Sequence, residues 1–215
     1  MKKFRFAILG AGHIARQFCD AVSRIDGCEV CAVASKSLVR AENFAKENGV
    51  ENYYDDYEML LEKEKPDCAY IAVTSNDHYR LSVLCVNHSV PVLCEKAMFQ
   101  NSEEAKNLYA LASEKKIFVM EALWSRYLPA VQQVKRWVEQ EKIGMPTVLQ
   151  CNIGFLAPDE KENRYFNPKL GGGAAKDITV YAYEITTFIL NQAIKNISVS
   201  ETWSDTGVDV TNHVS

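Results

Sequence analysis

Short apolar runs alternate with amphipathic segments through the first 120 residues. The apolar runs at 4–9, 29–34, 50–54, 68–74, 90–94 and 117–120 suit buried strands. Helical spacing between them predicts helices at 14–25, 38–47, 56–63, 80–87 and 102–115, the last with Ser102 as its N-cap. Continuously apolar strands are typical of a parallel sheet that is covered on both faces. The pattern therefore predicts an α/β domain with a doubly wound parallel sheet over residues 1–122.

The pattern changes after Glu121. A helix is predicted at 128–141 and a longer, alternating strand at 147–155, followed by a polar loop at 157–169 and the run Gly171-Gly172-Gly173. A helix at 176–190 and strands near 197–202 and 208–214 come next. These elements predict the start of a second, α+β domain at 123–215. Because the last strand has no following hairpin partner, we expect the chain to be a fragment and this domain to be truncated.

A glycine-containing turn joins the first predicted strand to the first predicted helix. It reads Gly10-Ala11-Gly12-His13-Ile14-Ala15, which has the context of the dinucleotide-binding fingerprint. Gly10 would allow the tight turn, and Gly12 would let the backbone approach a pyrophosphate. The amides of Gly12, His13 and Ile14 would then face the phosphates at the helix N-terminus. The alternative is a strand-to-helix turn that binds nothing.

The end of the second strand bears on which dinucleotide would bind. An acidic residue at this position holds the ribose 2′-hydroxyl of NAD, but this chain has Ser35 and Lys36, with Arg40 one turn later. A hydroxyl and two cations suit a 2′-phosphate, whereas a carboxylate would repel it. The sequence thus favours NADP over NAD. NAD stays possible, because Lys36 can equally be a solvated surface residue.

Polar residues follow the fourth and fifth predicted strands. Glu95 and Lys96 come directly after the fifth strand, and Thr74, Asn76 and His78 follow the fourth. The carboxyl ends of parallel strands share one edge, where ligands bind in open α/β sheets. These residues would therefore lie beside the nicotinamide of a bound cofactor. The alternative for Lys96 is a solvated end to its strand.

Asp177 and Tyr181 form a second candidate pair in the predicted helix 176–190. Residues four apart in an α-helix project from one face, so the pair could present a carboxylate and a phenol to one substrate. The alternative is a Tyr181 that packs in the core and an Asp177 that caps the first turn.

Composition narrows the class of ligand. The formal net charge is −4 and no long basic run occurs, which argues against a nucleic acid or a membrane as partner. Seven cysteines are scattered through apolar segments, as buried free thiols are in a reducing compartment. Cys28 and Cys31 would point to opposite faces of a strand, so we expect no metal site there. We expect a cytoplasmic protein that acts on a small molecule.

Several motifs together resemble the glucose-fructose oxidoreductase and inositol dehydrogenase family (Gfo/Idh/MocA), in its dihydrodiol dehydrogenase-like branch. The motifs are Gly10-Ala11-Gly12, Glu95-Lys96, Met120-Glu121-Ala122-Leu123-Trp124-Ser125-Arg126-Tyr127, and Gly171-Gly172-Gly173-Ala174 through Asp177 to Tyr181. The resemblance spans the whole chain in the right order. It implies an open, mainly antiparallel sheet in the second domain, and a homodimer when the chain is full length.

The resemblance also implies an enzyme and roles for its residues. The expected activity is NAD(P)-dependent transfer of a hydride to or from a hydroxyl or carbonyl of a sugar, cyclitol or diol. Lys96 would hydrogen-bond the reacting oxygen, Tyr181 would be the acid/base, and Asp177 would orient the substrate or Lys96. Trp124 would contact the cofactor. Ala97 stands where the family has proline, which leaves the placement of Lys96 open.

Two other functions remain compatible with this fold. One is a protein that binds NAD(P) as a sensor or regulator without catalysis, because a fold does not fix a function. The other is an NAD-dependent glycosidase, which some relatives of the fold are. The substrate itself stays undefined, because specificity resides in loops such as 157–170.

Overall fold

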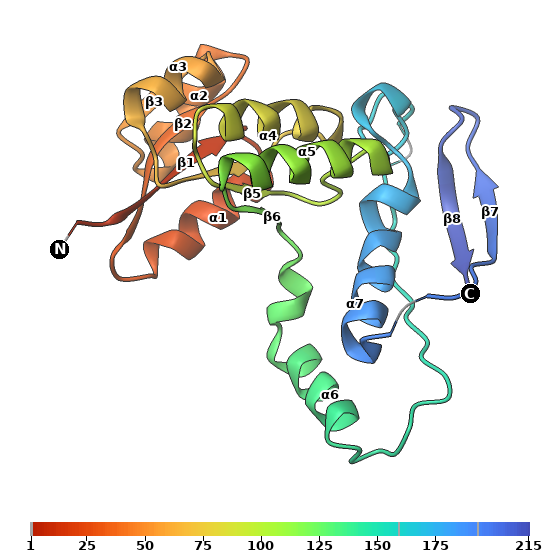
Figure 1. The fold of residues 1–215 in the computed structure, drawn as a ribbon. Helices are drawn as coiled ribbons and strands as arrows, with labels where there is room; N and C mark the ends of the chain where they lie inside the picture. The colour runs from red at the N-terminus through yellow and green to blue at the C-terminus, as the bar shows by residue number, and fades with distance from the viewer. Residues whose placement is uncertain (1, 159, 193) are drawn as a thin grey trace. The chain divides into compact units, whose positions relative to one another are not determined.

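The computed structural model describes residues 2–158, 160–192 and 194–215 (Figure 1). The chain divides into two compact units, the first ending at Ala122 and the second running from Leu123 to Ser215.

The first unit alternates strands and helices along the chain. Its strands are β1 (Phe4–Leu9), β2 (Cys28–Ala34), β3 (Asn52–Tyr54), β4 (Cys68–Ile71), β5 (Val92–Cys94) and β6 (Val119–Glu121). Its helices are α1 (His13–Ser23), α2 (Leu38–Asn48), α3 (Tyr57–Glu64), α4 (His78–Asn87) and α5 (Ser102–Lys115), with a 3₁₀ turn η1 (Ser75–Asp77) before α4. Every strand and helix predicted for residues 1–122 is present.

Within the described residues these strands form one six-stranded parallel sheet in the order β3-β2-β1-β4-β5-β6. The order reverses beside β1, because β2 and β3 lie on one side of it and β4, β5 and β6 on the other. Ligands of open α/β sheets bind at such a reversal, outside the carboxyl ends of the strands. The doubly wound, Rossmann-type prediction is confirmed.

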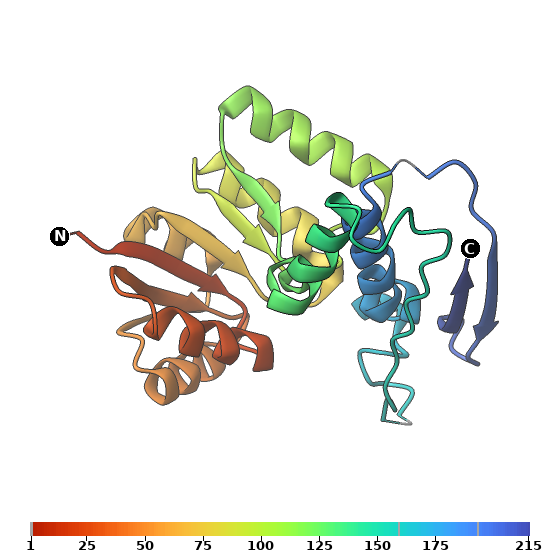
Figure 2. The same cartoon turned by 90° about the horizontal axis from the view of Figure 1, so that it is seen from below.

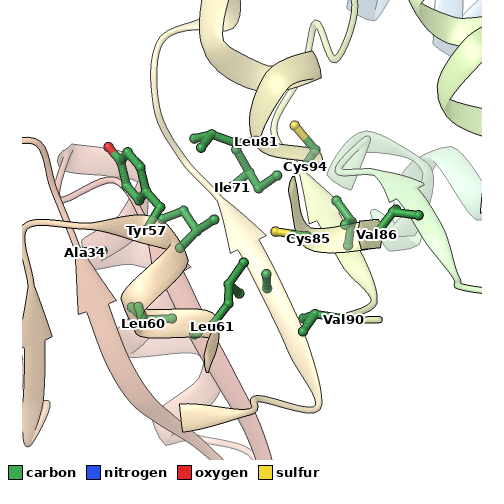
Figure 3. Packing of buried hydrophobic residues seen from close by; sticks show 14 of the residues in the cluster. Ala34, Tyr57, Leu60, Leu61, Ile71, Leu81, Cys85, Val86, Val90 and Cys94 are labelled. Atoms are coloured by element: carbon green, nitrogen blue, oxygen red, sulfur yellow. The ribbon is translucent and has the colours of Figure 1, made fainter. Parts of the chain in front are cut away.

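Two apolar clusters cover the two faces of the sheet. One cluster packs α1 and α2 on Ile8, Val33 and Tyr70, through residues that include Cys19 and Phe44. Figure 2 shows these two helices, in red and orange, on one side of the sheet and α5, in green, on the other. The second, larger cluster packs α3, α4 and α5 on the opposite face, and Figure 3 shows part of it. Both faces of the sheet are buried under helices, which explains why the strands are apolar throughout.

The helix ends follow from local capping. Gly49 ends α2 with φ of 68°, the left-handed conformation that favours glycine. The prediction that Ser102 caps α5 is wrong by one residue. Asn101 is the N-cap, and its side chain accepts a hydrogen bond from the Glu104 amide at 3.0 Å. Asparagine and serine are both good N-caps, so composition alone does not separate the two positions.

The second unit contains helices and one hairpin. Its elements are the 3₁₀ turns η2 (Trp124–Tyr127) and η3 (Pro168–Leu170), the helix α6 (Pro129–Glu139), the π-helix η4 (Ala175–Thr179), the helix α7 (Val180–Leu190), and the strands β7 (Val199–Trp203) and β8 (Asp209–Val214). β7 and β8 pair antiparallel, as predicted for the second domain. No described helix in the chain is long and apolar enough to span a bilayer.

Two predictions for this unit need correction. The strand expected at 147–155 is absent, and the described residues of that segment have no regular secondary structure. An alternating sequence becomes a strand only when another strand hydrogen-bonds to it, and among the described residues β7 and β8 pair only with each other. The helix expected at 176–190 is present, but its first turn is a π-helix, so α-helical spacing does not apply to Asp177.

Candidate functional site

The backbone that surrounds the turn after β1 requires a glycine at position 10. Gly10 has φ of 115°, and its amide donates to Ala34 O at 2.8 Å. A Cβ at this position would lie 2.5 Å from Ala72 O and 2.9 Å from the Val73 amide nitrogen. The backbone of the segment after β4 therefore occupies the space, and only glycine fits.

Gly12 is under no such constraint. It is the N-cap of α1 with φ of −103°, and the nearest atom to a Cβ there would be Ala72 O at 3.9 Å. No side chain caps α1, and its first turn contains no acidic residue. A bare glycine at an uncapped helix N-terminus leaves room for an anion to approach the backbone amides. The turn therefore fits the pyrophosphate of a dinucleotide, and His13 and Ile14 follow Gly12 in the first turn.

The backbone on both sides of Lys96 is fixed at the end of β5. The Glu95 amide donates to Ile71 O at 2.9 Å, and the Glu95 carboxylate accepts a hydrogen bond from Tyr70 Oη at 2.6 Å. On the other side, the amide of the fully buried Met98 donates to Glu121 Oε1 at 2.8 Å. The Lys96–Ala97 peptide bond is cis. The half-buried Lys96 thus lies just past the carboxyl end of β5.

His78 lies beneath this end of β5. Its side chain is 1% exposed, with Nδ1 2.9 Å from Ala97 O and Nε2 3.0 Å from Val73 O. Burial lowers the pKa of His78, although the two carbonyls act in the opposite direction. A neutral imidazole donates through one nitrogen only, so His78 hydrogen-bonds one carbonyl and packs against the other. The ring links the segment after β4 to the segment after β5.

Asp77, in the segment after β4, is linked to the segment after β2. It accepts hydrogen bonds from Lys36 Nζ at 2.6 Å and from Arg80 Nε at 3.2 Å. Burial disfavours the ionised carboxylate, but the two cations outweigh burial and hold the pKa of Asp77 below its usual value. Lys36, one of the cations expected at a 2′-phosphate, is therefore paired with a carboxylate 41 residues along the chain.

The other expected cation, Arg40, lines a pocket of about 350 Å³ in the first unit. Ala11 of the glycine turn, Ser37 and Asn43 line the same pocket. The neighbouring Ser35 is buried and its amide donates to Tyr54 O at 3.1 Å. The structure thus brings the glycine turn and Arg40 to one cavity. Thr74 and Asn76 lie where predicted, at and just after the N-cap of η1.

In the second unit, the tyrosine and the tryptophan predicted for the site are in direct contact. Trp124 Nε1 donates to Tyr181 Oη at 2.8 Å, and the rings meet edge to face with centroids 5.9 Å apart. Tyr181 is 9% exposed, whereas Trp124 is 54% exposed. A donated hydrogen bond stabilises negative charge on the phenolic oxygen, which an acid/base tyrosine develops when it gives up its proton.

Asp177 lies in the π-helix η4 and is paired with Arg164. Arg164 Nη1 is 3.2 Å from Asp177 Oδ1, and its guanidinium stacks over the Tyr165 ring at 4.2 Å. Arg164 belongs to the loop at 157–169. That loop therefore supplies a charged partner to the predicted carboxylate.

The sequence analysis gave no role to three polar residues around Trp124 and Tyr181, although two of them, Ser125 and Arg126, stand in the motif at 120–127. Glu184 is 2% exposed and accepts hydrogen bonds from Ser125 Oγ at 2.6 Å and from Arg126 Nε at 2.5 Å. A glutamate inside the apolar helix α7 was the available signal, because a buried charge requires a partner. Its partners are 58 and 59 residues away, which no local pattern reveals.

Comparisons with known proteins agree with this description. The chain is 33% identical over 210 residues to a trans-1,2-dihydrobenzene-1,2-diol dehydrogenase of Mus musculus, with 96% of this chain and 62% of that protein covered. A solved oxidoreductase of Agrobacterium radiobacter in complex with NAD⁺, L-tartaric acid and magnesium superposes with a TM-score of 0.82 at 20% identity, covering 99% and 62% of the two chains.

A second solved structure shows the same fold. It is a variant of a 3-ketoreductase of Actinomadura kijaniata in complex with TDP-benzene and NADP, with a TM-score of 0.82 at 22% identity over 99% of this chain and 66% of that one. The chain thus spans less than two thirds of the length of the curated relatives it matches.

The sheet order and the glycine turn define the class, which is the Rossmann-type dinucleotide-binding fold. The model of the oxidoreductase family with an NAD-binding Rossmann fold matches residues 4–123, and the Gfo/Idh/MocA C-terminal domain matches residues 131–215. The chain belongs to the Gfo/Idh/MocA oxidoreductase family.

Proposed function

We propose that the chain is part of an NAD(P)-dependent dehydrogenase or reductase that acts on a hydroxyl or carbonyl of a diol, cyclitol or sugar. The observation that carries the proposal is the position of Gly12, where the folded chain leaves open the space that a side chain would fill. The name of the mouse relative supports a diol as substrate.

We propose distinct roles for the chain's own residues. The amides from Gly12 to Ile14 would bind the pyrophosphate, and Glu95, Thr74, Asn76 and Trp124 would contact the remainder of the cofactor. When bound, the nicotinamide accepts or supplies the hydride. In the oxidation direction, the Lys96 ammonium donates a hydrogen bond to the reacting oxygen and stabilises its negative charge.

Tyr181 is the proposed acid/base. In the same direction its phenolic oxygen takes the proton that leaves the substrate hydroxyl, and in reduction it returns that proton. The indole N–H of Trp124 donates to this oxygen and favours its negative form. Asp177, held by Arg164, is proposed to orient the substrate.

We propose that NADP is the preferred cofactor. Arg40, beside the glycine turn in one pocket, would bind a 2′-phosphate. Lys36 would do the same after exchanging its bond with Asp77, which Arg80 continues to neutralise. Titration with NADPH and NADH, followed by nicotinamide fluorescence, tests this preference. Equal affinity for the two cofactors would refute it.

Substitution of Lys96 tests the catalytic proposal. Lys96→Met removes the ammonium and keeps the length of the side chain. We expect turnover to fall at least about a thousandfold while the cofactor still binds. The test uses a panel of diols, sugars and dicarbonyls, with absorbance of the nicotinamide as the readout. Turnover of Lys96→Met at the rate of the unmodified protein would refute the assignment.

The state of the cysteines bears on where in the cell the protein is located. All seven cysteines lie among the described residues and all are free, which supports a cytoplasmic location.

The full-length protein is proposed to be a homodimer, supported by exposed apolar residues on the hairpin of the second unit, such as Val199, Trp203 and Val214. Light scattering on the full-length protein measures its oligomeric state.

A further inference from the structure

A charged side chain is buried behind the Trp124–Tyr181 pair. Glu184 is 2% exposed, and its two carboxylate oxygens are bound separately, Oε2 by Ser125 Oγ and Oε1 by Arg126 Nε. Burying a carboxylate costs free energy that an ion pair offsets only with good geometry. Replacement of a whole buried ion pair by apolar residues of similar volume is often neutral or stabilising. The charge therefore calls for an explanation other than stability.

The ion pair joins the same two segments as the Trp124–Tyr181 hydrogen bond. Ser125 and Arg126 directly follow Trp124 in η2, and Glu184 lies three residues, or about one turn, after Tyr181 on α7. Two separate links thus fix η2 against α7. Two links define an orientation between the segments, which one hydrogen bond alone does not.

Arg126 is itself held from other sides. Its backbone carbonyl accepts a hydrogen bond from Gln132 Nε2 at 2.5 Å, and its guanidinium stacks on the Phe188 ring at 5.2 Å. Phe188 lies one turn after Glu184 on α7. The arginine is therefore a fixed partner for Glu184 and not a mobile surface cation.

We infer that Glu184, with Ser125 and Arg126, is a positioning residue that holds the Trp124 indole N–H on the Tyr181 hydroxyl. The inference rests on the proposed function, in which Tyr181 transfers the proton. Trp124 is more than half exposed, so packing alone does not fix its ring. The buried carboxylate holds the side chains of the two residues that follow Trp124, Ser125 and Arg126, and through them the short turn that carries the ring.

The indole N–H resonance of Trp124 tests the inference without any assay of activity. A background with Trp137→Phe and Trp203→Phe leaves Trp124 as the source of the indole signal, which is recorded by ¹⁵N–¹H NMR on the whole chain. Tyr181→Phe removes the acceptor and marks the position of a released indole. Glu184→Gln and Ser125→Ala then each weaken one side of the carboxylate network. Glu201→Gln, at an exposed glutamate on β7, is the matched control.

We expect Glu184→Gln and Ser125→Ala to shift the resonance toward its position in Tyr181→Phe, and Glu201→Gln to leave it in place. The inference is overturned if both network variants unfold at lower denaturant concentration but keep the native indole resonance, because the network is then purely structural. Should Glu184→Gln fail to fold, the Ser125→Ala spectrum decides alone.

A kinetic measurement separates this inference from the proposed function. In an active protein we expect Glu184→Gln to lower kcat about ten- to a hundredfold with the KM for the cofactor unchanged. If the unmodified protein turns over no substrate while the network variants still shift the indole signal, the proposed function fails and the positioning role stands. A raised KM with unchanged kcat in Glu184→Gln contradicts the positioning of Tyr181.

Discussion

The two glycine-rich segments of this chain serve different ends. In the first unit, Gly10 is required by the backbone around it, whereas Gly12 has open space where its side chain would be. In the second unit, Gly171 and Gly173 have positive φ angles of 79° and 118°. A Cβ on Gly172 would meet the carbonyl oxygens of three neighbouring residues at 2.7–2.9 Å.

This difference distinguishes glycines that the backbone conformation requires from a glycine that leaves space for a ligand. All three residues of the run in the second unit are explained by their own fold, so this run is no sign of a binding loop. Gly12 is the one position in the two segments whose glycine the surrounding described residues do not explain. The distinction predicts opposite outcomes for the same substitution, glycine to alanine, at different positions.

The largest loss of stability is expected for Gly10→Ala. The new Cβ would overlap the Ala72 carbonyl, and the φ of 115° is unfavourable for alanine. We expect the free energy of unfolding to fall by about 3–5 kcal/mol, as measured by urea denaturation. A loss below about 1 kcal/mol would show that the backbone after β4 can yield.

Gly172→Ala is expected to be the next most destabilising. Its φ is not in the left-handed region, but the loop carbonyls of Arg164, Tyr165 and Asn167 leave no room for a methyl group. We expect a loss of about 2 kcal/mol in the same assay. NADPH affinity should stay unchanged, and a selective loss of cofactor binding would instead mark this run as part of the binding site.

The buried His78 of the first unit provides a further test, because its burial makes the stability of this unit depend on pH. Its pKa is lowered by burial, so the unfolded chain binds more protons near pH 6 than the folded chain does. The contribution of His78 to stability is present above its usual pKa of 6.5 and is lost as the pH falls through its folded value. The slope from this one group is at most about 1.4 kcal/mol per pH unit.

Urea denaturation between pH 5 and pH 8 measures this slope. His78→Gln keeps a hydrogen-bonding side chain but removes the titration, so its stability should depend less on pH than that of the unmodified chain. Identical slopes for the two proteins would show that His78 titrates normally in the folded chain.

The smallest change in stability is expected for Gly12→Ala. Nothing in the folded chain obstructs the methyl group, and only the poorer N-cap costs about 0.5 to 1 kcal/mol. Cofactor affinity should nevertheless fall at least about tenfold, because the methyl group would occupy the path of the phosphates. Fluorescence titration with NADPH measures this loss. Unchanged affinity would remove the main support for the phosphate site.

The sequence predicted the first unit better than the second for a physical reason. The strands of a buried parallel sheet are apolar throughout, so each one is visible in its own local sequence. The segment 147–155 has an equally clear alternating pattern, but a strand also needs a neighbour, which no local pattern supplies. The π-turn before Tyr181 also has no sequence signature comparable to a glycine cap.

The candidate site shows the same difference between features that local sequence predicts and features that depend on tertiary packing. The glycine turn, Lys96 and Tyr181 stand in motifs, and their positions on elements were predicted. Their partners were not, because Lys36 pairs with Asp77, Arg164 with Asp177, and Ser125 with Glu184 only after distant segments have packed. Polar networks of this kind depend on the tertiary structure, whereas apolar periodicity depends on one element at a time.

The π-turn at η4 has a consequence for how this part of the chain can change in length. Its i to i+5 hydrogen bonding encloses one residue more than an α-turn does, and Tyr181 is the second residue after it. Deletion of a single residue from 175–179 would let the segment wind as a regular α-helix. A π-turn holds one extra residue within about the rotation of an α-turn, so the residues that flank 175–179 would keep their orientation, while those within the turn, Asp177 among them, would move around the helix axis relative to Tyr181. Insertions and deletions are generally tolerated in surface loops, but here the spacing of the chain is itself part of the candidate site.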